Sequence, residues 1–167
     1  MMDGLKKQTG GMTVNHFLIT QFEMGRERLQ SFLQSTPETL SDQMPKGFNN
    51  TIHWNAGHIL TVADALFELK MLPPKYKELF WNGTKPADWT GDVPSLKTLI
   101  SQLQEQMEPI KETLSDGLEK KLEKPIQLPN GYQMETTGSV VGFNNSHEAI
   151  HMGYMNALKR TIEGQSQ

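Results

Sequence analysis

The 167-residue sequence contains no cysteine. This absence excludes disulfide bonds, zinc sites built on thiolates and a cysteine nucleophile. If the protein uses thiol chemistry, the thiol must arrive as a co-substrate.

Long apolar runs and basic runs are also missing. No stretch approaches the roughly 20 apolar residues of a membrane-spanning helix, and no apolar run follows Lys6 and Lys7 as it would in a secretory signal. The 16 basic and 19 acidic residues are interspersed and give a formal net charge of -3, so no basic stripe can follow a phosphate backbone. We therefore expect a cytoplasmic protein that binds neither membranes nor nucleic acid.

The sequence does have four amphipathic segments. Apolar residues recur every three or four positions from Val14 to Phe32, which is typical of a helix. Similar patterns predict helices over about 51–71, 95–114 and 139–162, with Pro109 expected to kink the third of these. We predict a flexible tail over residues 1–12 and one domain over residues 13–167. The predicted fold class is all-α, a four-helix bundle with long crossover loops.

Two connections between these helices are long. Residues 72–94 include Tyr76, Phe80, Trp81 and Trp89, and they form either a lid over a site or a short helix near 75–80 that covers the core. Residues 118–138 contain a turn signal at 129–131 between two short apolar stretches, which indicates a possible small hairpin.

The histidines are the main candidates for chemistry. His147 and His151 are four residues apart on a predicted helix, so both rings can reach one ion. At about 100° per residue, His58 falls on the apolar side of the second helix, whereas His53 falls in its polar sector and is predicted to be solvated. His16 is predicted to be a partly exposed residue at the start of the first helix.

Three buried imidazoles are costly unless each finds a partner, and a shared cation provides one for all three. The sequence therefore predicts a metal site formed by His58, His147 and His151. Three histidines leave a coordination position open, as in catalytic zinc sites.

The segment His147-Glu148-Ala149-Ile150-His151 also matches the zincin protease motif, in which the glutamate is a general base. No histidine follows His151, so the third ligand must come from upstream, which argues against a zincin. Glu148 is rotated about 100° from His147 and need not face the metal. Asn144 and Tyr154 lie near the predicted metal face and are candidates for contacts to the ligands or the substrate. Ordinary core packing explains Tyr154 equally well.

Trp54-Asn55-Ala56-Gly57-His58-Ile59, followed later by His147-Glu148-Ala149-Ile150-His151-Met152-Gly153, resembles the DinB/YfiT-like superfamily over most of the chain. The resemblance implies a four-helix bundle with a histidine triad gathered at one end. It also implies a divalent metal ion, zinc or nickel, bound by His58, His147 and His151, and a homodimer. Members often carry Arg-Gly-Gln after the second histidine of the pair, where this chain has Met152-Gly153-Tyr154, so a polar pocket contact differs.

Related branches of the superfamily transfer low-molecular-weight thiols such as bacillithiol, mycothiol or glutathione, or isomerise small acids. Our preferred hypothesis is a metal-dependent enzyme that transfers a small thiol to an electrophilic molecule, which the absence of cysteine fits. The alternatives are a metal-dependent hydrolase and a non-catalytic bundle whose metal organises the fold or a dimer.

Overall fold

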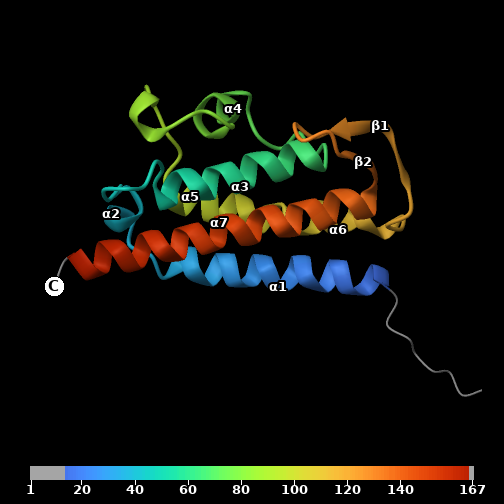
Figure 1. Cartoon of the computed structure of the whole chain (residues 1–167), viewed down its shortest axis with the longest axis horizontal. Helices are drawn as coiled ribbons and strands as arrows, with labels where there is room; N and C mark the ends of the chain where they lie inside the picture. The colour runs from blue at the N-terminus through green and yellow to red at the C-terminus, as the bar shows by residue number, and fades with distance from the viewer. Residues whose placement is uncertain (1–13, 166–167) are drawn as a thin grey trace, which may run out of the picture.

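The computed structural model describes residues 14–165, with side chains described from Phe17 to Gly164. Four long helical segments lie side by side in it (Figure 1). They are α1 (Val14–Gln34), α3 (Ile52–Leu66), the interrupted pair α5 (Leu96–Glu105) and α6 (Met107–Ser115), and α7 (Thr137–Gln165). This confirms the predicted all-α bundle. The predicted tail and the side chain of His16 lie outside the described residues.

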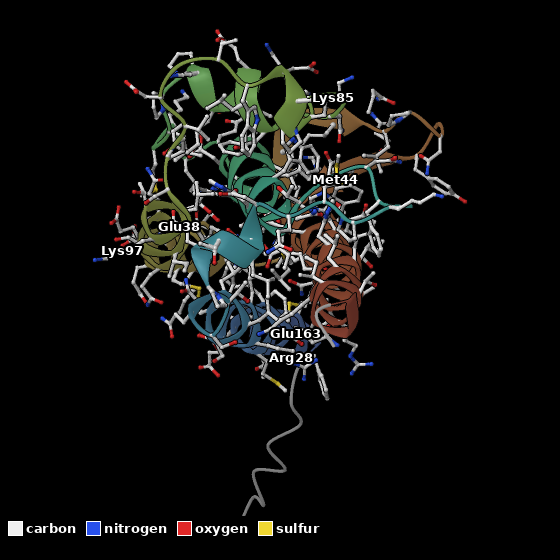
Figure 2. All side chains as sticks on the ribbon, turned by 90° about the vertical axis from the view of Figure 1, so that its left-hand side faces the viewer. Arg28, Glu38, Met44, Lys85, Lys97 and Glu163 are labelled. Carbon is white, nitrogen blue, oxygen red and sulfur yellow. The ribbon has the colours of Figure 1, made fainter. Side chains whose placement is uncertain are left out.

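The direction of the helices shows how the chain is threaded. In Figure 1, α1 and α7 run one way, while α3 and the α5–α6 pair run the other way. Successive helices α3 and α5 are therefore parallel, and the chain between them must travel back along the bundle. That connection contains α4 (Lys75–Phe80) and a short 3-10 turn (Pro86–Asp88), which confirms the short-helix reading of this segment. Figure 2 looks along the bundle and shows the segment carrying Lys85 as an outer layer over α3.

α3 is the central helix. Every residue from Ile52 to Ala63 is buried, because α4 and its flanking loops cover the side of α3 that would otherwise face water. A Cβ atom on Gly57 would overlap the ring of Phe80, so only glycine allows α4 to approach this closely. The Thr51 side chain caps the helix by accepting a hydrogen bond from the Trp54 backbone N–H.

Two helix boundaries differ from the predicted ones. α3 ends at Leu66 rather than near residue 71, because Glu68 and Lys70 adopt left-handed conformations with φ of 52° and 56° that cannot continue an α-helix. The helix predicted over 95–114 is broken at Gln106. Pro109 has no N–H to donate to the carbonyl of Glu105, so the break falls one turn before the proline, where a kink was expected.

The remaining elements close the two ends of the bundle. α2 (Glu38–Ser41) lies in the connection between α1 and α3. The predicted hairpin is confirmed: β1 (Lys121–Gln127) pairs antiparallel with β2 (Gln133–Thr136), and Ile126 lies opposite Met134. Figure 1 places this hairpin beside the end of α3. None of the described helices is long and apolar enough to cross a bilayer.

Candidate metal centre

His58 of α3 and His147 and His151 of α7 form one cluster between the two helices. One ring nitrogen from each lies within 4.8 Å of the others. The Nε2 atoms of His58 and His147 are 3.1 Å apart, and the three ring centroids are 4.5 to 5.0 Å apart. The structure thus brings together the three histidines singled out in the sequence. The cluster lies near the middle of α3 and α7, however, and not at one end of the bundle as the resemblance implied.

His58 is held in one orientation from two sides. Its Nδ1 atom is 2.7 Å from the backbone carbonyl oxygen of Phe80, the last residue of α4. A carbonyl can only accept, so Nδ1 carries the proton and the Nε2 lone pair faces the cluster. The indole of Trp54 stacks on the same ring, with centroids 4.7 Å apart and planes within 11°. The close approach of α4 at Gly57 therefore also orients a candidate ligand.

His151 is oriented by Asn55, a residue to which the sequence analysis gave no role. The Nδ1 atom of His151 is 2.7 Å from the Asn55 side-chain oxygen. The Asn55 amide nitrogen donates to the carbonyl of Thr51 at 2.6 Å, which fixes which end of the amide faces His151. His151 must then be protonated at Nδ1, which leaves its Nε2 lone pair free. Hydrogen bonds of this kind set the tautomer and orientation of metal-binding histidines.

His147 has a hydrogen-bond partner for only one of its two ring nitrogens. Its Nδ1 atom is buried with no partner, and the ring of Phe143 stacks against it. Its Nε2 atom faces the Nε2 atom of His58, whose lone pair is already committed toward the cluster. A neutral His147 can donate from Nε2 to that lone pair, whereas a cation at this point would accept lone pairs from both Nε2 atoms. Two nitrogens that share a tetrahedral zinc ion at about 2.0–2.1 Å are about 3.3 Å apart, so the observed spacing fits.

The cluster is neutral at neutral pH. Burial, followed by the proximity of His151 and His58, lowers the pKa of His147 to about 3. Burial and then the proximity of His58 lower the pKa of His151 to about 4. Burial also lowers the pKa of His58, although the hydrogen bond to Phe80 opposes that shift. Unprotonated imidazoles are the form that binds metals, so these three residues fit a divalent ion.

Glu148, the acid of the zincin-like segment, faces away from the cluster and is committed elsewhere. The Nε atom of Arg26 donates to its two carboxylate oxygens at 2.8 and 2.9 Å, and Nη2 lies 2.8 Å from Oε1. Arg26 is fully buried and also donates to the side chain of Gln106. Asn144 donates to Glu148 at 2.8 Å and is not among the residues that line the cluster's pocket, in contrast to its predicted place near the metal face.

His53 is not solvated, so that prediction is wrong. It is only 5% exposed, because the polar sector of α3 is covered by the α4 connection. Its Nδ1 atom is 2.7 Å from a carboxylate oxygen of Asp42, and its Nε2 atom is 2.7 Å from the carbonyl oxygen of Pro94. Trp89 packs edge-on against the ring. His53 therefore ties two loops to α3 and does not join the cluster.

The histidine cluster opens into a pocket of about 780 Å³. Its walls come from α3, α7, the hairpin tip at 126–129 and the loops at 49–50 and 81–82. Tyr154 lines it, and its hydroxyl oxygen accepts a hydrogen bond from the backbone N–H of Asn49. Of the two tryptophans in the connection predicted to be a lid or a short helix, Trp81 lines the pocket, whereas Trp89 donates to the Leu79 carbonyl and packs on His53.

Comparisons with known proteins identify a family and a similar fold. Residues 21–155, which include all three histidines, match the family model of the DinB superfamily. The fold is similar to the crystal structure of a conserved protein from Enterococcus faecalis, with a TM-score of 0.64 and 17% sequence identity, covering 92% of this chain and 99% of that one. At that identity the likeness concerns the fold alone. No curated protein matches the chain.

Proposed function

The chain belongs to the DinB superfamily, and from that premise we propose that it is a metal-dependent enzyme. In this proposal His58, His147 and His151 hold one divalent ion, zinc or nickel, and the enzyme transfers a low-molecular-weight thiol to an electrophilic small molecule. The observation that carries the proposal is that all three histidines line a pocket of about 780 Å³. A metal that only stabilised the fold would have no need of such an opening.

The ion would supply charge. Neutral imidazoles leave the full double charge of a divalent cation in place, which lowers the pKa of a thiol or water that reaches it. The residues of the chain hold the ligands in place. Phe80 and Asn55 fix the orientations of His58 and His151. The absence of cysteine means that the chain itself supplies no thiol.

Tyr154 is the residue we propose to contact the substrate. Its hydroxyl oxygen accepts a hydrogen bond from Asn49, which leaves the hydroxyl hydrogen free to be donated into the pocket. Tyr154 is three residues after His151 on the same helix, so the donor lies one turn from the cluster. A hydrogen bond from this hydroxyl would orient a substrate against the histidines.

The first test is metal analysis of the purified protein and of single alanine variants. We expect about one ion per chain in the wild type and a sharp loss in the His58, His147 and His151 variants. His53→Ala is the matched control for His58→Ala, because His53 is also buried on α3 but lies outside the cluster. An equal loss of metal in the control would contradict the ligand assignment.

The second test is turnover. Metal-loaded protein is mixed with a small thiol and a chromogenic electrophile, and separately with a chromogenic ester and no thiol. Transfer that is abolished by chelation would support the proposal, while thiol-independent ester cleavage would favour a metal-dependent hydrolase. If chelation unfolds the protein and neither reaction proceeds, the metal has a structural role only.

A further inference from the structure

Apart from the proposed ion, the pocket beside the histidines is lined almost entirely by uncharged side chains. Its apolar walls include Val62 and Leu66 of α3, Phe143 and Ile150 of α7, and Ile126 and Leu128 of the hairpin. Its other polar groups are neutral amides and the Tyr154 hydroxyl. No lysine or arginine is among the described residues that line it, and Glu68 is the one acidic residue there.

The lysines near the hairpin line a neighbouring cavity, which shares Leu66, Glu68 and Ile126 with this pocket. Lys120, Lys121 and Lys124 line this neighbouring cavity, which β1 shares with α6 and the end of α3. The residues that β1 and the following turn present to the histidine pocket are Ile126 to Pro129. The three lysines therefore line the neighbouring cavity and are not among the residues that line the histidine pocket.

A pocket with this lining disfavours anions. Once a thiolate fills the open position of the proposed ion, a carboxylate or phosphate group that enters the rest of the cavity loses its hydration, and no cationic side chain in the lining replaces the lost interactions. The carboxylate of Glu68 adds repulsion. An uncharged aromatic or aliphatic molecule meets neither penalty, and its burial against the apolar walls is favourable.

We infer that the electrophile this site takes is an uncharged, largely apolar aryl or alkyl compound. This inference rests on the proposed function. In the transfer, the thiol sulfur forms a bond to the electrophilic carbon, the leaving group departs with its bonding electron pair, and the thiol proton passes to solvent. The neutral amides and the Tyr154 hydroxyl would bind polar but uncharged substituents, such as nitro or carbonyl groups.

Binding of unreactive compounds tests the inference separately from turnover. Chelator-treated, zinc-free protein is titrated with 1,3-dinitrobenzene and with 3,5-dinitrobenzoate, which share a ring and differ by one carboxylate. Quenching of tryptophan emission reports binding, because Trp54 and Trp81 both line the pocket. We expect the neutral compound to bind at least about tenfold more tightly. The same order is expected on zinc-loaded protein whose open coordination position is filled by saturating 2-mercaptoethanol, and equal or tighter binding of the benzoate in both states would overturn the inference.

Ile150 provides a matched pair of variants. It lines the pocket but is 71% exposed, so a polar replacement leaves the core intact. Ile150→Arg places a cation in the wall and should reduce the preference for the neutral ring by about fivefold or more, whereas Ile150→Gln should leave the preference unchanged. An unchanged preference in the arginine variant would overturn the inference. Selective binding without any transfer once thiol is added would count against the proposed function alone.

Discussion

Removing the carboxylate of Glu148 should destabilise the protein severely. Glu148 accepts hydrogen bonds from Arg26 and Asn144, and the Arg26 side chain is completely buried. Glu148→Gln keeps the size of the side chain but leaves the buried guanidinium without a counter-charge. Breaking a buried ion pair in this way costs about 3–5 kcal/mol, against a total stability of about 5–15 kcal/mol for a typical domain.

The loss of stability is measured by urea unfolding and by thermal unfolding, both followed by circular dichroism, on zinc-loaded and on chelated protein. For a chain of this length, about 2–4 °C of Tm is lost per kcal/mol, so Tm should fall by about 6–20 °C. Replacing Arg26 and Glu148 together, by Met and Leu, should cost less than replacing Glu148 alone, because no uncompensated charge then remains in the core. The double variant controls for a general intolerance of substitution at these positions.

One result would refute this reasoning. If Glu148→Gln stays within about 1 kcal/mol of the wild type and yet abolishes activity, Glu148 acts as a general base, as in a zincin, and the ion pair is not its main role. A loss of stability with the metal content retained would support the structural role.

Three further predictions follow from the site. Asn55→Ala should weaken metal binding by about 10–100-fold in competition with a chromogenic chelator, and an unchanged affinity would mean that Asn55 does not orient His151. His53→Ala should lower Tm because two buried hydrogen bonds are lost, so an unchanged Tm in thermal unfolding would argue against its role as a tie between loops. The pKa values of His147 and His151, about 3 and 4, lie below the value of about 6.5 expected in the unfolded chain. The unfolded state therefore binds more protons below pH 6.5, and these residues make the metal-free protein less stable as pH falls from about 6.5 toward 4. Over this range the urea midpoint of the metal-free wild type should fall relative to the midpoints of the His147→Ala and His151→Ala variants. A relative rise as the pH falls would contradict the assignment.

The sequence predicted the helices and the histidine cluster because both depend on local spacing. Residues four apart share a helical face whatever surrounds the helix, so the sequence alone placed His147 and His151 side by side. His53 shows the limit of the same argument. Its place in the polar sector of α3 was read as exposure, but α4 and its loops cover that sector. Whether a helix face meets water depends on a distant segment, which periodicity does not reveal.

The Arg26–Glu148 pair was missed although part of its signal was present. Arg26 is four residues after Phe22 and three before Leu29, so a charged residue stands inside the apolar stripe of α1. A buried arginine requires a buried acid. The partner is 122 positions away on α7, and only the packing of the two helices identifies it. Asn55 was similarly within reach, since it precedes His58 by three residues on one helix face.

The separation of the site's residues along the chain has a consequence for how the protein is made. His58 and His147 are 89 positions apart, and α7 is the last helix of the described chain to be synthesised. When α3 has left the ribosome and α7 has not, the nascent chain offers a single imidazole from the site. One imidazole is a weak metal ligand. Capture of the proposed ion must wait until α7 has been translated and has docked against α3. Metal loading would then mark molecules whose bundle is complete.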